Sequence, residues 1–283
     1  VWFKRDLRIF DHRPLFEAIN SGKPVLPLYI LEPDLWREPD MSHRHYQFLV
    51  ESIQDLTRQL LKVGLTLVIK VGVAKDVLES FEKDYEKITI YSHQETWNKW
   101  TYQRDLTVLS WTKSKEINWL EYKQIAVERR LRSRNHWSKF RDEFIAEGII
   151  SIFRTDIPSV AQSSDALPSF KDLNLREMFV TNQQKGGRIE AVETLRSFLR
   201  TRALNYSKGI SSPNTSPISC SRISPYLAFG CISIREVLKA AQLREFDLAH
   251  TKSSQTSQWR RSISGFKERL RWHCHFIQKL EDE

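Results

Sequence analysis

The sequence predicts an α/β fold: a doubly wound, parallel, five-stranded sheet domain, then a long linker and the start of an all-helical domain. Three observations lead to this prediction. Short apolar runs alternate with helical periodicity over roughly the first 125 residues, the periodicity is lost from Arg129 to about Lys185, and helical segments without a strand pattern follow Gly186-Gly187. Strands that alternate with helices pair in parallel through right-handed crossovers, so a doubly wound sheet is the expected architecture.

The elements of the sheet domain are predicted in chain order. Strands are expected over 1–3, 25–30, 65–72, 87–91 and 117–122, with helices over 14–20, 43–62, 74–85 and 101–114 between them. The helix over 43–62 has the strongest pattern, because apolar residues such as Phe48, Ile53 and Leu60 recur at helical spacing. We place the end of this domain at residue 125.

The remaining chain is expected to hold a linker over 126–186 and a helical domain over 187–283. Pro158, Ser159, Pro168 and Ser169 are typical of a surface connection. The segment 188–201 has the spacing of an amphipathic helix, with Ala191, Leu195, Phe198 and Leu199 on its buried face. Further on, Ser233-Ile234-Arg235-Glu236 fits a capping box that starts another helix.

Composition limits the class of protein and suggests the charge of its partner. The 283 residues are enough for two domains, and 40% hydrophobic with 28% charged residues is ordinary for a globular protein. A net charge of +9 and a pI near 9.4 favour a polyanionic partner such as nucleic acid.

The cysteines and the hydropathy of the chain indicate its cellular compartment and whether it crosses a membrane. Cys220, Cys231 and Cys274 show no C-x-x-C spacing, so neither a zinc ribbon nor a disulfide framework is predicted. This fits a reducing compartment, and we expect the protein in the cytoplasm. No apolar run is long enough to cross a bilayer, so no membrane partner is expected.

The most informative segment is the hydroxyl-rich stretch 215–230. Ser224 suits a helix N-cap and Pro225 suits the first helical position, where the missing N–H costs nothing. A helix N-terminus presents unpaired N–H groups, and Ser221, Arg222 and Ser224 would converge there on a phosphate or pyrophosphate. The residues alone leave open that this is a surface turn that caps a structural helix.

Three other segments are candidates for binding, each with a structural alternative. Residues 4–8 follow the first strand at the sheet edge where α/β proteins bind ligands, and could instead form a salt-bridged loop. Residues 93–100, with two tryptophans, could line a pocket for a planar pigment or simply pack. The basic run 129–137 could contact DNA phosphates, or form a solvated face or an interdomain contact. No G-x-G-x-x-G follows the first strand, which argues against an ordinary dinucleotide-dependent dehydrogenase.

Two segments resemble the DNA photolyase/cryptochrome family. Ser-Arg-Ile-Ser-Pro-Tyr-Leu-Ala-Phe-Gly-Cys-Ile-Ser, starting at Ser221, is similar to the segment that holds the FAD phosphates in that family. Residues 1–12 resemble the family's opening strand and loop, Trp-Phe-Arg-x-Asp-Leu-Arg-x-x-Asp-Asn, with His12 in place of Asn. The resemblance covers the whole chain, thinly between about 125 and 185. The resemblance implies a Rossmann-like antenna domain over 1–125, an interdomain linker over 126–186 and the first part of a helical FAD-binding domain over 187–283. We therefore expect the chain to be the front part of a longer protein.

The resemblance implies a set of FAD contacts. They are Tyr206, Cys220, Ser221, Arg222, Ile223 and Ser224. Cys220 stands where Thr is common in the family and could still contribute its backbone N–H. Arg222 could instead pair mainly with a carboxylate. An antenna chromophore, whose identity the sequence does not give, would be a second cofactor.

A third segment implies DNA contacts. Residues 265–276 resemble the family's Trp-x-x-Glu-Leu-x-Trp-Arg-Glu-Phe helix, with Phe266, Arg269 and His273 in place of the Trp, Glu and Arg. Trp272 keeps the aromatic residue that stacks beside a flipped pyrimidine dimer, and an extruded base needs such a platform. The implied DNA contacts are Arg269, Trp272 and His273, with core packing as the alternative for Trp272. The adjacent His273, Cys274 and His275 do not face one ion on a helix, so no metal site is predicted.

The implied activity is FAD-dependent, blue-light-driven repair of cyclobutane pyrimidine dimers in DNA, the reaction of a deoxyribodipyrimidine photo-lyase, a carbon–carbon lyase. Bond cleavage by electron transfer from the flavin needs no catalytic side chain, and none is assigned. A cryptochrome-type photoreceptor without repair is the alternative, favoured by the substitutions at Phe266, Arg269 and His273. A basic nucleic-acid-binding protein without cofactor is the third hypothesis. We expect a monomer.

Overall fold

The computed structural model describes residues 1–131, 133–250 and 254–282. It divides into two compact units. Unit 1 comprises residues 1–124 and 150–187, and unit 2 comprises residues 125–149 and 188–283. The stretch 126–186, expected to be one linker, is therefore shared between the two units. Each unit is described by itself.

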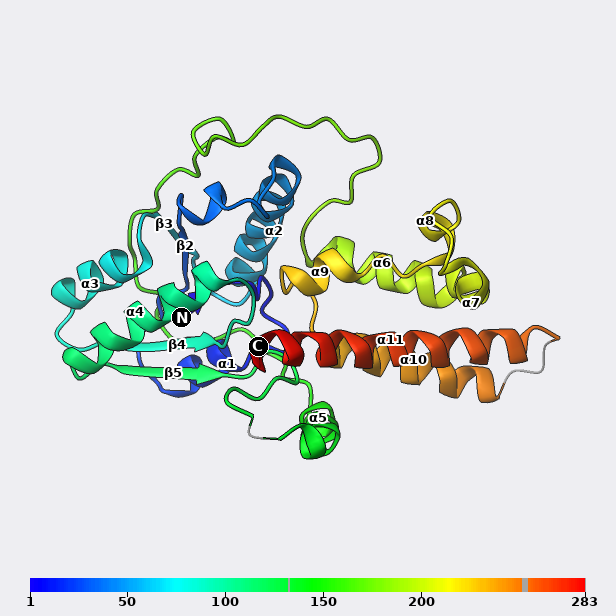
Figure 1. The fold of residues 1–283 in the computed structure, drawn as a ribbon. Helices are drawn as coiled ribbons and strands as arrows, with labels where there is room; N and C mark the ends of the chain where they lie inside the picture. Colours follow the sequence, from blue (N-terminus) through cyan, green and yellow to red (C-terminus); the bar gives the residue numbers. More distant parts are fainter. Residues whose placement is uncertain (132, 251–253, 283) are drawn as a thin grey trace. The chain divides into compact units, whose positions relative to one another are not determined.

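Unit 1 is built on parallel strands, as predicted. β1 (Trp2–Phe3), β2 (Leu28–Leu31) and β3 (Val68–Val71) form one sheet in the order β1-β2-β3. β4 (Thr89–His93) and β5 (Asn118–Tyr122) form a second, parallel pair that lies beside β1 (Figure 1). The α/β class is confirmed.

The prediction of one five-stranded sheet needs correction, because the structure has three strands and two strands in separately hydrogen-bonded sheets. β1 is only two residues long. Immediately after it, the backbone N–H of Lys4 donates to Oδ1 of Asp6 at 2.7 Å. This N–H is therefore turned away from a neighbouring strand, and β1 ends before a ladder to β4 can form.

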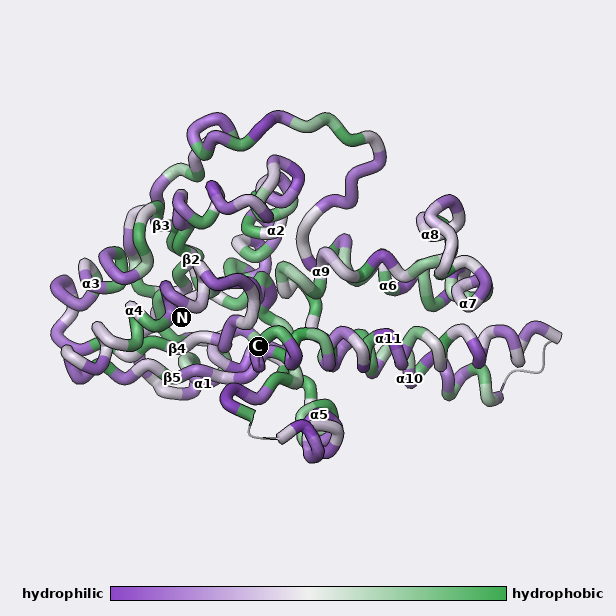
Figure 2. Tube along the Cα trace, in the orientation of Figure 1, coloured by the Kyte–Doolittle hydropathy of each residue, from purple (hydrophilic) through white to green (hydrophobic). Residues whose placement is uncertain are grey.

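Helices cover both faces of the strands in unit 1. α3 (Ala74–Asp84) and α4 (Lys99–Ser114) pack with Trp2, Val68 and Ile90 in one apolar cluster. Successive strand residues point to opposite faces, so Phe3 points away from this cluster and contacts the ring of His12 at the start of α1 (Arg13–Asn20). The doubly wound arrangement is thus present. Figure 2 shows strongly hydrophobic residues along β2 and β3, as expected for strands covered on both sides.

Local sequence signals explain the helix boundaries in unit 1. α2 spans His43–Lys62, the range predicted from its periodicity, and the hydroxyl of Ser42 accepts from the N–H of His45 at its N-terminus. Asn98 caps α4 in the same way through Thr101. A short 3-10 helix, η1 (Leu35–Arg37), precedes α2 and buries Trp36.

Residues 150–165 return along unit 1: Ser159 and Val160 bond the chain at Thr66 and Val25, and the end of the segment bonds the outer edge of β3. The N–H of Asp165 donates to the carbonyl of Ile69 at 2.8 Å, and its Oδ2 accepts from the N–H of Val71 at 2.9 Å. The hydroxyl of Ser164 accepts from the N–H of Ile69 at 3.1 Å. An uncovered edge strand is a template for pairing with other chains. We call residues 150–165 the edge segment, because Ser164 and Asp165 at its end occupy this edge.

Unit 2 is helical in its described part, as predicted for the second region. Its elements are η2 (Arg134–His136), α5 (Trp137–Ala146), α6 (Arg188–Arg200), η3 (Arg202–Asn205), α7 (Tyr206–Gly209), α8 (Ser216–Ser219), α9 (Ser224–Ala228), α10 (Ile234–Ala249) and α11 (Thr256–Asp282). The capping box at the start of α10 is confirmed, with Ser233 and Glu236 exchanging hydrogen bonds of 3.1 and 3.0 Å. α10 and α11 pack side by side (Figure 1).

α5 was not predicted, because it lies where the periodicity is lost. Its helix begins at Trp137, which is buried and donates from Nε1 to the carbonyl of Ala126 at 3.2 Å. Phe144 is its other large buried apolar residue. Two such anchors in ten residues are too few to give a clear helical pattern.

None of the helices in the described ranges is long and apolar enough to span a bilayer.

Candidate functional site

The hydroxyl-rich segment forms a loop between α8 and α9, which we call the 220–224 loop. The predicted N-cap at Ser224 is wrong: Ile223 is the N-cap, and Ser224 is the first helical residue and is exposed. The reason is local. Arg222 takes a left-handed conformation with φ 56°, and Ile223 is already right-handed, so the helix begins one residue earlier than the sequence suggests.

The backbone conformations of Arg222 and Ile223 are those of a nest, a turn that can bind an anion. Arg222 is left-handed and Ile223 follows with φ −86° and ψ −12°. A left-handed residue followed by a right-handed one turns three successive N–H groups, here those of residues 222, 223 and 224, toward one point. Such a backbone nest binds phosphate-like groups. The donors at this site are therefore backbone groups that turn at Arg222, whereas a side-chain cap at Ser224 is absent.

Arg202, on η3, holds the loop from behind. Its guanidinium donates to the carbonyl of Cys220 and, at 3.3 Å, to the carbonyl of Ser221. It also donates to the carbonyl of Thr194 at 2.7 Å and to the hydroxyl of Ser197 on α6. No local pattern in the sequence indicates this role of Arg202, because its partners lie as far as 19 positions away.

Tyr206 is buried beside the same loop. Its ring makes edge contacts with Phe198 and Phe266, at centroid distances of 5.5 and 6.0 Å. Burial, and to a smaller extent the nearby Cys220, raise the pKa of its phenol to about 12, while Arg269 lowers it. The phenol is therefore protonated at neutral pH and available as a donor.

The structure thus gathers the residues expected to contact FAD in one region of unit 2. Tyr206 and Ile223 are buried, Cys220, Ser221 and Arg222 are half-buried, and Ser224 is exposed. The short helices α7 and α8, which carry or precede these residues, approach each other closely. A Cβ on Gly209 of α7 would lie 2.0 Å from Oγ of Ser219 on α8. Only glycine allows this approach.

Two of the three expected DNA contacts share one face of α11. Trp272 is 42% exposed, and the guanidinium of Arg269 lies over its ring at 4.3 Å. Trp272 also borders a cavity of about 370 Å³ with Trp137, Arg271 and His275. An exposed indole with arginines around it is suited to stacking on a base.

His273 is placed differently from the other two. It is half-buried, its Nδ1 is buried without a partner among the described residues, and burial lowers the pKa of the imidazole. The next residue, Cys274, is fully buried, and His275 is exposed against Trp137. These three side chains therefore lie in three different environments.

Two arginines of the basic run 129–137 form ion pairs within unit 2, while Arg130 and His136 are exposed. Arg134 pairs with Asp282 at 3.0 Å and Arg129 approaches Glu281 at 3.8 Å, both near the end of α11. Trp137 is buried. Arg132 lies outside the described residues. These contacts favour a structural role for the run over a DNA-binding one.

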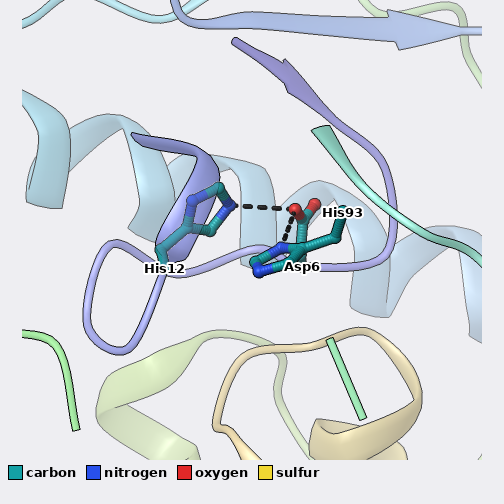
Figure 3. Close-up of side chains that lie close together, drawn as sticks. All are labelled: Asp6, His12 and His93. Carbon is teal, nitrogen blue, oxygen red and sulfur yellow. Dashed lines mark hydrogen bonds and ion pairs between the residues drawn. The ribbon is translucent and has the colours of Figure 1, made fainter. Parts of the chain in front are cut away.

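Unit 1 contains a buried cluster that the sequence did not predict. Oδ2 of Asp6 accepts from Nε2 of His12 at 2.9 Å and from Nδ1 of His93 at 2.7 Å (Figure 3). All three side chains are at most 3% exposed. Two weak signals existed: His12 replaces the Asn of the resembled motif, and His93 ends the fourth strand.

The cluster has the ligand types of a metal site, and its hydrogen bonds already use the atoms that would bind an ion. In the described residues it is the one group of His, Cys, Asp or Glu with ligand atoms close enough for one ion. However, Nδ1 of His12 accepts from the backbone N–H of Leu15 at 3.1 Å and so carries a lone pair. In a neutral imidazole the proton is then on Nε2, the atom that would have to bind the metal. Burial lowers the pKa of His93 to about 3, so its ring is also neutral.

A second buried network fills the carboxyl edge of the strands. Arg104 of α4 pairs with Glu32 at 3.0 Å, with Glu95 at 2.5 Å and with Asp105 at 2.9 Å. Asp105 also accepts from Nζ of Lys4 at 3.1 Å. Burial raises the pKa of Glu32 to about 7, against the opposing effect of Arg104. Lys4, Glu32 and Glu95 follow the ends of β1, β2 and β4, where an open α/β sheet would otherwise bind a ligand.

The two antenna candidates at this edge are therefore packed. Residues 4–8 form the salt-bridged loop that was their structural alternative. In the segment 93–100, Glu95 pairs with Arg104, and the guanidinium of Arg5 lies 3.9 Å from the ring centroid of Trp97. A cation on the indole face takes the place that a stacked pigment would need.

Comparison with known proteins identifies relatives of the whole chain. The model of the DNA photolyase family matches residues 1–127. The chloroplastic/mitochondrial cryptochrome DASH of Arabidopsis thaliana is 27% identical over 268 residues, which cover 87% of this chain and 47% of that protein. This chain thus spans about half the length of this curated relative.

Solved structures share the fold over nearly the full chain. The cryptochrome of Synechocystis sp. PCC6803 has a TM-score of 0.80 at 19% identity and covers 99% of this chain and 60% of its own. A class III photolyase from Agrobacterium tumefaciens has a TM-score of 0.77 at 20% identity, with 99% of this chain and 58% of its own covered. At these identities the likeness establishes the fold alone.

Proposed function

We propose that the chain is a member of the DNA photolyase/cryptochrome family, whose model matches residues 1–127, and that unit 2 binds the pyrophosphate of FAD at the 220–224 loop. The observation that carries this proposal is the left-handed turn at Arg222 followed by the right-handed Ile223, which directs three backbone donors to one point. The buried phenol of Tyr206 beside the loop would donate a further hydrogen bond. Cys220 would contribute through its backbone.

For the whole protein we propose blue-light repair of cyclobutane pyrimidine dimers in DNA, a carbon–carbon lyase reaction. FAD, when bound, would supply the light absorption and the electron. This chain's part would be to hold the cofactor and to present Trp272 as a stacking platform for the extruded dimer. Arg269, on the face of Trp272 and near Tyr206, would supply positive charge to the DNA backbone.

A photoreceptor without repair activity is the second candidate. It is favoured by Arg269, which stands where the resembled helix has Glu and covers one face of Trp272. A cation stacked on that face competes with a base for the same surface. Repair activity therefore requires that Arg269 leave the face of Trp272 when DNA binds.

The division into an antenna domain over 1–125, a linker over 126–186 and an FAD-binding domain over 187–283 is part of the same proposal. We propose no antenna pigment at the carboxyl edge of the strands, because Arg104 and its carboxylates fill it. The free Cys220, Cys231 and Cys274 support a reducing, intracellular compartment.

The test is an absorption spectrum of the whole protein, followed by blue-light irradiation with dimer-containing DNA. Flavin bands and loss of dimers would support repair, and Trp272→Ala would then lower the repair yield while the flavin stays bound. Phe276→Ala, at an exposed residue of the same helix, is the matched control and should repair normally. Flavin bands without repair would favour the photoreceptor, and a protein without flavin would refute the proposal.

A further inference from the structure

We propose that Arg202 is the positioning residue of the 220–224 loop: it orients the loop's N–H donors and supplies an uncompensated positive charge for a pyrophosphate. This inference rests on the proposed FAD binding and adds to it a residue outside the segment that resembles the family's phosphate contacts. Arg202 lies in η3 and is half-buried.

The first step is the direction of the loop carbonyls. The guanidinium of Arg202 binds the carbonyls of Cys220 and Ser221, two successive peptide groups. A planar guanidinium presents its donors in a fixed fork, so both carbonyls must point toward it. All described peptide bonds are trans.

The second step is the direction of the loop donors. In a trans peptide the N–H points opposite to the C=O. With the carbonyls of Cys220 and Ser221 held on Arg202, the N–H groups of Ser221 and Arg222 point away from it. The N–H of Arg222 is the first of the three donors that the left-handed turn brings together. Arg202 therefore fixes the side of the loop on which an anion can bind.

The third step is charge. The guanidinium of Arg202 donates to neutral groups, which are the hydroxyl of Ser197 and the carbonyls of Thr194, Cys220 and Ser221. Within the described part of the chain, no carboxylate lies within ion-pair distance of its guanidinium. Burial and the nearby Arg222 lower the pKa of Arg202, and Cys220 opposes them with a smaller effect, so the surroundings on balance disfavour the guanidinium charge. A phosphate bound at the loop would supply the missing negative charge.

The alternative is a purely structural tie between α6 and the loop. A structural tie would stabilise the pocket for any ligand, charged or neutral. A positioning and charge role predicts instead a selective effect on ligands that carry phosphate. FAD and riboflavin share the isoalloxazine ring and differ in the pyrophosphate and adenosine, so their relative affinities separate the two roles.

The experiment measures the Kd of the whole protein for FAD and for riboflavin by flavin fluorescence, at low and at physiological salt. Arg202→Met removes the donors and the charge, and Arg202→Lys keeps the charge on a single donor atom. We expect Arg202→Met to weaken FAD binding by about tenfold, to leave riboflavin binding unchanged and to flatten the salt dependence of the FAD Kd. Arg202→Lys should fall between wild type and Arg202→Met, with the salt dependence kept.

Arg200→Met, at the exposed end of α6, is the matched control and should bind both flavins as wild type does. Thermal unfolding checks that each variant is folded. Equal loss of FAD and riboflavin affinity in Arg202→Met would overturn the inference in favour of the structural tie, and so would an unchanged FAD Kd. A wild-type protein that binds no FAD would refute the proposed function and the inference with it.

Discussion

At the scale of single residues, one carboxylate oxygen of Asp6 links three segments of unit 1 by hydrogen bonds. Oδ2 of Asp6, after β1, receives hydrogen bonds from His12 at the start of α1 and from His93 at the end of β4. His12 thereby serves two purposes, because its other ring nitrogen caps α1 through Leu15. The hydrogen bonds from the two histidines hold the pKa of Asp6 well below its usual range, against the opposing effect of burial.

These three groups make the stability of unit 1 dependent on pH. Burial lowers the pKa of His93 to about 3 and also lowers that of His12, so below pH 6.5 the unfolded chain binds protons that the folded chain does not. The contribution of the two neutral histidines to stability is therefore full above pH 6.5 and falls as the pH drops toward 3, by up to about 1 kcal/mol per pH unit for each histidine. The low pKa of Asp6 adds a further loss that begins below about pH 4, the ordinary pKa of this carboxyl in the unfolded chain.

His93→Gln tests this dependence. Urea unfolding of the variant should show about half the loss of stability between pH 6.5 and 4.5, with a cost of about 1–3 kcal/mol at pH 8 for the lost hydrogen bond. His250→Gln, at an exposed histidine, should keep the wild-type pH profile. An unchanged slope in His93→Gln would show that other groups cause the pH dependence.

At the scale of elements, the short helices around the 220–224 loop depend on close contact. α7 and α8 approach at Gly209, where a Cβ would meet Oγ of Ser219 at 2.0 Å and its Cβ at 2.7 Å. Ser219 is itself buried and bonded to the carbonyl of Thr215. The loop is thus held by Arg202 on one side and by α8, which directly precedes it, on the other.

Gly209→Ala should lower the free energy of unfolding of unit 2 by about 1–3 kcal/mol, because overpacking forces α8 to shift. Adding Ser219→Gly removes the clashing atoms and should recover part of the loss. Gly148→Ala is the control, since a Cβ there meets no atom within 4 Å. Denaturant unfolding measures all three, and equal stability of Gly209→Ala and Gly148→Ala would contradict the close approach.

Elements were predictable wherever a local pattern determines them. The bounds of α2 and the capping box of α10 follow from periodicity and from the Ser-x-x-Glu spacing. The N-cap of α9 was mispredicted, because the left-handed conformation of Arg222 has no signature in a non-glycine residue. The role of Arg202 depends on carbonyls that lie 8 to 19 positions away in the sequence, and the role of His93 depends on side chains 81 and 87 positions away. No local pattern could therefore reveal them.

At the largest scale, unit 1 is completed by chain that comes after all of its strands. The edge segment returns to bond β3, with Asp165 as its main contact through both its backbone and its side chain. The sequence predicted a linker here from its prolines and serines. Composition cannot distinguish a free linker from one whose hydroxyls and carboxylate bond a strand edge, as Ser164 and Asp165 do.

Asp165→Ala should expose the edge of β3. Loss of the bond to the N–H of Val71 should cost about 1–3 kcal/mol and increase amide hydrogen exchange in residues 68–71. Asp156→Ala, at an exposed residue of the same segment, should leave exchange at wild-type level. Protected amides in Asp165→Ala would mean that the backbone contacts of the segment suffice.

The position of the edge segment also sets an order of events during translation. After Val71 is made, about 90 more residues must be synthesised before Asp165 is available, which takes about 5–20 s at the usual rate of protein synthesis. During that time the ribosome carries a nascent sheet whose outer strand has no neighbour. Chaperone contact with the nascent chain should therefore be greatest in this interval and should end soon after residue 165 leaves the exit tunnel.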